Sequence, residues 1–85
     1  MEAQVLTLPS VAHDLRLTLQ AKLVLSYLKK HGNISPMEAE RVYGISRLAS
    51  CIHEIRNVGY FVHTAMRRDD YGHKYARYEF VNRMN

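Results

Sequence analysis

Residues 35–59 of this 85-residue sequence carry two helix start and stop signals in close succession. Ser35, Pro36 and Glu38 form the first start. Serine can accept a first-turn N–H, proline needs no donor at the first position, and a glutamate three residues after the cap can reach back to it. Gly44 favours a left-handed conformation and is expected to end this helix. A three-residue turn and a second helix, ended by Gly59, complete a helix-turn-helix arrangement.

The second helix is expected to have two different faces. Ile45 should be buried in the turn, and Ser46 should cap a helix over residues 47–58. At about 100° per residue, one face carries the apolar side chains of Leu48, Ile52 and Ile55. The opposite face carries Ser46, Ser50, His53 and Asn57. The apolar face should pack on a core, and the polar face should meet solvent or a partner.

The flanking sequence predicts one more helix and two strands. Apolar residues recur at helical spacing over residues 19–31, between a Thr18 cap and a Gly32 stop. Asn33 and Ile34 then have room for a very short strand. Residues 60–67 and 75–82 alternate with a period of two and are rich in aromatic and β-branched side chains, which is typical of strands. The polar residues between them should form a hairpin tip.

Composition limits the class of protein. The length favours one domain at residues 18–85, preceded by an N-terminal arm or extra helical turn at residues 1–17. The net charge is +4, and residues 45–85 hold seven basic against four acidic side chains, which permits a polyanionic partner. A single cysteine excludes an intramolecular disulfide, and no membrane span or signal peptide is expected. No catalytic, metal-ligating or cofactor-binding motif is present, so an enzyme, a metal site and a cofactor are not expected.

Several short runs resemble one family of DNA-binding domains. They are Tyr43-Gly44-Ile45-Ser46-Arg47-Leu48, then Ile52-His53-Glu54-Ile55-Arg56, then Gly59-Tyr60. The chain from about residue 19 to residue 81 resembles the small winged helix-turn-helix domains common in bacteriophage and prophage genomes. The resemblance implies an α+β, mainly α fold, with three helices followed by a two-stranded β-hairpin wing. It also implies DNA binding in regulation or recombination.

Two sets of residues are candidates for DNA contact. On the second helix of the central pair, the recognition helix, they are Ser46, Arg47, Ser50, His53 and Asn57. On the wing they are Arg67, Arg68, His73, Lys74 and Arg77. Hydroxyl and amide groups can read base edges, whereas wing cations suit phosphates and the minor groove. For both sets the alternative is a solvated surface with internal ion pairs.

Two single residues are singled out beside these sets. Arg56 lies between the two faces of its helix, so a phosphate contact and an internal pair with Glu38, Glu40 or Glu79 are both open, the internal role being favoured. Tyr71, at the wing tip, is the one tyrosine expected to be free for stacking on a base.

The first functional hypothesis is a sequence-specific double-stranded DNA-binding protein, either a repressor-like transcriptional regulator or an excisionase-like architectural factor. Such a small module has few base-reading side chains, so a homodimer is expected. The setting would be the cytoplasm of a bacterial host, at the nucleoid. The alternative is a phage-encoded protein-binding module that inhibits a host enzyme or defence complex. Salt dependence of DNA binding separates the two hypotheses.

Overall fold

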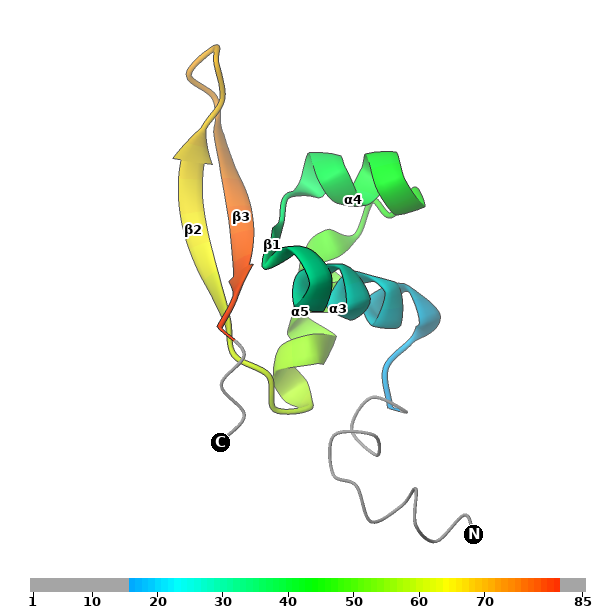
Figure 1. The fold of residues 1–85 in the computed structure, drawn as a ribbon. Coiled ribbons are helices and arrows are strands. Elements are labelled where there is room, and N and C mark those ends of the chain that lie inside the picture. The colour runs from blue at the N-terminus through cyan, green and yellow to red at the C-terminus, as the bar shows by residue number, and fades with distance from the viewer. Residues whose placement is uncertain (1–15, 82–85) are drawn as a thin grey trace, which may run out of the picture.

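The computed structural model describes residues 16–81, in which three helices are followed by a long β-hairpin (Figure 1). Residues 1–15 and 82–85 lie outside the described part, and so does most of the predicted N-terminal arm at residues 1–17. The helices are α3 (Leu19–His31), α4 (Pro36–Tyr43) and α5 (Leu48–Asn57). The strands are β1 (Asn33–Ile34), β2 (Val62–Arg68) and β3 (Lys74–Phe80). This order is that of a winged helix-turn-helix.

The predicted caps of α3 and α4 are confirmed. The Thr18 hydroxyl accepts the N–H of Ala21, and Gly32 ends α3 in a left-handed conformation. Ser35 and Glu38 form a complete capping box, in which each side chain accepts the backbone N–H of the other residue. Gly44 ends α4 at φ 69°, which a residue without Cβ adopts at low cost.

The start of α5 differs from the prediction that Ser46 caps it. Arg47 occupies the cap position, and its side chain makes no hydrogen bond to the first turn. The Arg47 carbonyl oxygen instead accepts the N–H groups of Ser50 and Cys51. The physical reason lies in the preceding turn, because Ile45 is pulled into the core, where only 1% of its surface is exposed, and its N–H bonds back to α4. The helix therefore begins one residue later.

The two predicted strands are present with shifted ends, and a third strand joins them. Tyr60 precedes β2 because its N–H still bonds to the Ile55 carbonyl at the end of α5. The sheet is antiparallel with the order β1-β3-β2, and β1 pairs Ile34 with Tyr78. The expected short strand thus turns a two-stranded wing into a three-stranded sheet. Figure 1 shows β2 at the outer edge, with β3 between it and the helices.

One hydrophobic core joins the helices to the lower half of the hairpin. It consists of Leu17, Ala21, Val24, Leu25, Leu28, Ile34, Ala39, Ile45, Leu48, Cys51, Ile52, Ile55, Tyr60 and Val62. Tyr78 and Phe80 pack against it from β3. The predicted apolar face of α5 is confirmed, since Leu48, Ile52 and Ile55 are all buried. The core therefore holds α5 with its opposite face turned outward.

A hydrogen-bonded contact between the start of α3 and α5 was not predicted from the sequence. The Glu54 carboxylate accepts the Thr18 N–H at 3.0 Å and the Thr18 hydroxyl at 3.2 Å. A carboxylate at a helix N-terminus is also favoured by the helix dipole. Glu54 is therefore engaged with α3 and does not stand as a free acid on the outer face of α5.

We expect Glu54→Ala to lower the free energy of unfolding by about 1 kcal/mol, the usual cost of losing a cap interaction. Urea denaturation followed by circular dichroism measures this. Glu40→Ala is the control, because Glu40 is an exposed acid on α4. Equal stability of the two variants would show that the contact with Thr18 contributes nothing.

Candidate nucleic-acid interface

The outer face of α5 is polar and exposed. Ala49, Ser50, His53 and Asn57 are exposed, while Leu48, Cys51, Ile52 and Ile55 are buried beneath them. Among residues 16–81, no hydrogen bond or ion pair engages the side chains of Ser50, His53 and Asn57. Small and polar side chains of this kind allow close approach of a groove and can hydrogen-bond to base edges.

Arg47 and Ser50 lie beside the start of α3. Together with Thr18, Leu19, Gln20, Cys51 and Glu54 they line a shallow hollow between α3 and α5. Arg47 is exposed, and its guanidinium makes no ion pair within the described residues. The start of α5 lies next to it, so within residues 16–81 this corner combines a cation without an ion pair with a helix N-terminus that lacks a side-chain cap, a combination that favours anions.

Arg56 has the internal role that was favoured, but with unexpected partners. Its Nη2 donates to the Val62 carbonyl oxygen at 2.6 Å and to the Thr64 hydroxyl at 2.8 Å. Its Nε donates to the same carbonyl at 3.0 Å. The predicted pairing of Arg56 with Glu38, Glu40 or Glu79 is wrong, because its guanidinium lies against the start of β2. Arg56 therefore joins the end of α5 to the wing.

The wing tip is built around Asp69. Its Oδ1 accepts the N–H groups of Tyr71 at 2.9 Å and His73 at 2.8 Å. The hydrogen bond from the His73 backbone is the main reason why the pKa of Asp69 is lowered. Gly72, at φ 85°, allows the chain to turn back, and its carbonyl accepts Arg68 Nη1. Tyr71 projects from the tip with 86% of its surface exposed, as expected for the free tyrosine.

The remaining wing cations are unequally available. Arg67 pairs with Glu79 at 2.8 Å in a half-exposed ion pair. Arg77 is three-quarters buried and donates to the carboxylate of Glu38 and to the side-chain oxygen of Asn33. Within residues 16–81, Lys74 makes no hydrogen bond or ion pair with its side chain.

The Arg77–Glu38 contact fastens β3 to the capping box of α4. Burial opposes ionisation of Glu38, but hydrogen bonds from the Ser35 N–H and the Arg77 guanidinium outweigh it and lower the pKa of Glu38. The same carboxylate thus caps a helix and holds the sheet. Arg77 consequently belongs to the base of the wing, away from its tip.

This lowered pKa predicts a pH dependence of stability. Because the folded pKa lies below the unfolded value of about 4.3, the stabilisation is complete above that value and is lost as the pH falls through the folded pKa. We expect Glu38→Gln to flatten the loss of stability between about pH 5 and pH 3. Urea midpoints across this range measure the effect, with exposed Glu40→Gln as the control. Parallel pH profiles for wild type and Glu38→Gln would contradict the assignment.

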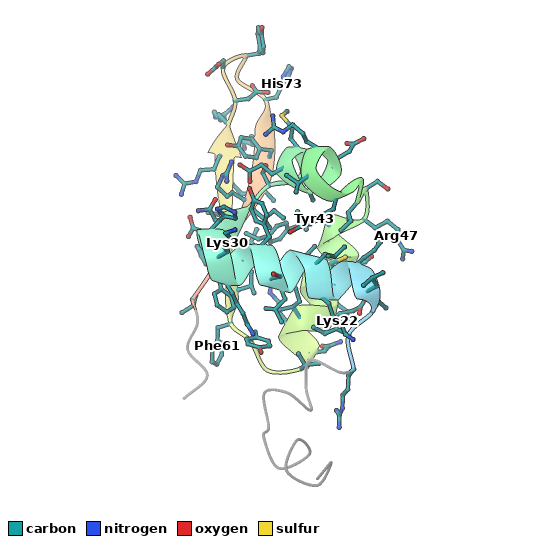
Figure 2. The ribbon with its side chains drawn as sticks, turned by 45° about the vertical axis from the view of Figure 1, so that its right-hand side comes forward. Lys22, Lys30, Tyr43, Arg47, Phe61 and His73 are labelled. Atoms are coloured by element: carbon teal, nitrogen blue, oxygen red, sulfur yellow. The ribbon has the colours of Figure 1, made fainter. Side chains whose placement is uncertain are left out.

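The predicted site residues form two separate groups. Figure 2 shows His73 at the hairpin tip and Arg47 beside the helices, far apart in that view. Arg47 and the wing tip therefore do not belong to one continuous patch. A partner that used both would be contacted at two points, as a long duplex can be.

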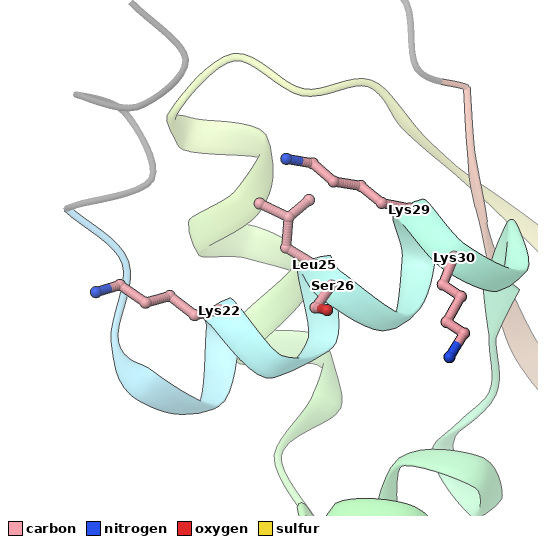
Figure 3. A pocket seen from close by; sticks show the side chains of 5 residues that line it. All are labelled: Lys22, Leu25, Ser26, Lys29 and Lys30. Carbon is pink, nitrogen blue, oxygen red and sulfur yellow. The ribbon is translucent and has the colours of Figure 1, made fainter. Parts of the chain in front are cut away.

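A further basic surface, on α3, was not selected from the sequence. Lys22, Leu25, Ser26, Lys29 and Lys30 line a shallow groove (Figure 3). Lys29 also places its ammonium 5.3 Å from the centre of the Tyr60 ring. Lys29 and Lys30 lie in the last turn of α3, where positive charge suits the helix dipole. Their groove is a second cationic surface of the molecule.

The fold and the exposed recognition-helix candidates define a winged-helix protein. The family model of the winged helix-turn-helix domain matches residues 19–83, so the chain belongs to this family. No curated protein and no solved structure matches the chain. Winged helix-turn-helix domains typically bind DNA and are not enzymes.

Within residues 16–81, no helix is long and apolar enough to cross a membrane. In the same residues, no group of three or more histidine, cysteine, aspartate or glutamate side chains is placed to hold a metal ion.

Proposed function

We propose that this protein binds double-stranded DNA sequence-specifically, as a phage- or prophage-type transcriptional regulator or excisionase-like factor. The observation that carries the proposal is the outer face of α5, where Ser50, His53 and Asn57 are exposed and have no hydrogen-bond or ion-pair partner among residues 16–81. The core fixes the orientation of this face, so the helix backbone already presents these side chains outward before any ligand arrives. The resemblance of residues 43–48 to phage domains supports the phage-type assignment.

In this proposal, α5 enters the major groove and the wing holds an adjacent phosphate or minor-groove segment. Ser46, Ser50, His53 and Asn57 supply hydrogen bonds to bases, and Arg47 reaches a phosphate or a guanine. At the wing, Lys74 and Arg68 carry most of the charge interaction, with His73 and Tyr71 beside them. Arg67 is a weaker contributor because Glu79 competes for it.

The internal contacts of Arg77 change its proposed role. A guanidinium that already bonds to Glu38 and Asn33 would have to give up both partners to reach DNA. We therefore propose that Arg77 positions the wing and that the tip residues contact the phosphates.

Because a single module reads few bases, we propose that two copies bind neighbouring half-sites as a homodimer. The proposed setting is the nucleoid of a bacterial host. One observation favours the alternative of a protein-binding module. Within residues 16–81, the outer face of α5 offers Arg47 as its one arginine without an internal hydrogen bond or ion pair, since Arg56 is engaged with β2.

The test is fluorescence anisotropy with a duplex selected from a random library, measured over a range of salt concentrations. Each phosphate contact contributes about −0.9 to the slope of log affinity against log salt. We expect Arg68→Ala with Lys74→Ala to reduce this slope by about 2 and to weaken binding of every duplex. Lys22→Ala with Lys30→Ala removes the same charge from α3 and is the matched control.

A second double variant tests base reading. Arg47→Ala with Ser50→Ala should cost about 1–3 kcal/mol of discrimination per lost base contact, with little change in binding to random DNA. Unchanged discrimination would show that α5 is not the recognition helix. If no duplex binds even at low salt, the DNA-binding proposal fails and the protein-binding alternative takes its place.

A further inference from the structure

Among residues 16–81, the outer strand of the sheet, β2, has one edge without a neighbouring strand. The order β1-β3-β2 leaves the far side of β2 without a strand partner in this part of the chain (Figure 1). An exposed strand edge is a template for pairing with another extended chain. The alternation of hydrogen-bonded and non-hydrogen-bonded pairs in the hairpin determines which backbone groups of β2 face this edge.

Two hydrogen bonds, one at each end of the hairpin, show which residue pairs are hydrogen-bonded. The Val81 N–H donates to the Phe61 carbonyl, and the Asp69 N–H donates to the His73 carbonyl. Since hydrogen-bonded and non-bonded pairs alternate in an antiparallel ladder, His63, Ala65 and Arg67 bond to β3. The backbone N–H and C=O groups of Val62, Thr64, Met66 and Arg68 consequently face the open edge.

Within residues 16–81, the side chain of Arg56 covers this edge at the end of β2 nearest α5. Arg56 donates hydrogen bonds to the Val62 carbonyl oxygen, which confirms that this group points outward. The same guanidinium also donates to the Thr64 hydroxyl, so this cover extends along the edge to the Thr64 side chain. Within residues 16–81, no hydrogen bond engages the backbone groups of Thr64 and Met66 on this side. The Met66 side chain is 61% exposed beside them. A short stretch of edge is therefore available for pairing.

The charges along β2 select the kind of strand that fits. Residues 62–68 contain two arginines and a histidine but no acid. On β3, Glu79 pairs with Arg67 and lies opposite His63, so it offsets one of these charges. An antiparallel copy of β2 centred on Ala65 would place Arg67 of each chain opposite His63 of the other chain, at opposite ends of the ladder. The paired strands would hold four arginines and no acid, so a second copy offers no charge complementarity and is a poor occupant. An acidic strand is the complementary one.

We propose that the open edge of β2 binds an extended acidic segment of a partner protein as an additional antiparallel strand. Side chains on alternate faces of the added strand would meet different surroundings. Acids on one face would lie beside His63 and Arg67, and an apolar residue on the other face would lie against Met66. Backbone bonds to Thr64 and Met66 would hold the strand. This interaction does not depend on DNA binding.

The probe is a blocked peptide of alternating aspartate and valine, compared with a lysine–valine peptide of the same length. Binding to the full chain is followed by amide chemical shifts and hydrogen exchange. We expect the aspartate peptide to slow exchange at the Thr64 and Met66 amides and to bind at least about tenfold more tightly than the lysine peptide. Binding should weaken as salt is added.

Backbone methylation separates strand pairing from simple charge attraction. The single cysteine, Cys51, allows ligation of residues 1–50 to a synthetic peptide of residues 51–85, in which one amide carries a methyl group. Methylation at Met66 should weaken binding of the aspartate peptide by about tenfold, the value of one or two lost hydrogen bonds. Methylation at Lys74 is the control, because that amide faces the opposite side of the hairpin.

Three results would overturn the proposal. They are absence of binding at millimolar peptide, shift changes centred on the α3 lysines in place of β2, and equal affinity of the Met66-methylated and Lys74-methylated chains. Hydrogen exchange in the unmodified chain decides the question if the methylated chain does not fold.

Discussion

Replacing Ile55 with alanine is expected to lower the free energy of unfolding by about 2–5 kcal/mol. Ile55 is fully buried on the inner face of α5. Its loss removes apolar contacts and leaves a cavity that the surrounding helices can only partly fill. A domain of this size is stable by only about 4–10 kcal/mol, so a large share of the variant would unfold at moderate temperature.

Urea denaturation followed by circular dichroism measures the loss. Ile55→Val should cost only about 0.5–1.5 kcal/mol, because most of the side chain is kept. Leu19→Ala is the matched surface control, since Leu19 is 74% exposed on α3 and should change stability by less than about 0.5 kcal/mol. If Ile55→Ala were as mild as Leu19→Ala, α5 would not be anchored as described, and the orientation of its outer face would lose its basis.

Arg77→Ala is expected to cost about 2–3 kcal/mol, because it leaves the Glu38 carboxylate partly buried without its cation and Asn33 without its donor. The same strand offers a matched comparison. Arg67 pairs with Glu79 across a surface about half exposed, and exposed pairs contribute only about 0.2–1 kcal/mol. Arg67→Ala should therefore be much milder than Arg77→Ala.

Chemical denaturation of both variants, together with the Glu38→Gln double-mutant cycle, tests this difference. Coupling between positions 38 and 77 is expected, whereas coupling between positions 38 and 67 should be near zero. DNA affinity adds a second readout. If Arg77→Ala left stability unchanged and abolished DNA binding, Arg77 would be a phosphate contact and its assignment to the wing base would be wrong.

The elements that could be predicted from the sequence are those set by neighbours along the chain. The capping box of Ser35 and Glu38 depends on a spacing of three residues, and the stop at Gly44 depends on one residue type. The buried face of α5 follows from helical periodicity alone. These local rules sufficed for three helices, a hairpin and the placement of the outer face of α5.

The contacts that were missed join residues distant in sequence. Glu54 bonds to Thr18 across 36 positions, and Arg77 bonds to Glu38 across 39. Each of these charged residues has several plausible partners in the sequence, and only the packing of the helices against the sheet selects one. The prediction that Ser46 caps α5 was wrong for a related reason. The burial of Ile45 in the core outweighed the preference of serine for the cap position. Which cations are free for DNA is therefore decided by tertiary structure.

The self-contained hydrogen bonding of the wing tip has a consequence for how such a protein can change. Asp69, Gly72 and Arg68 close the tip with bonds among themselves, and none of these bonds reaches a helix. The tip can therefore be exchanged, lengthened or recharged without disturbing the folding of the rest of the domain. It is a suitable place to graft a different loop, so that the contacts made beside the recognition helix can be redesigned separately from the helix itself.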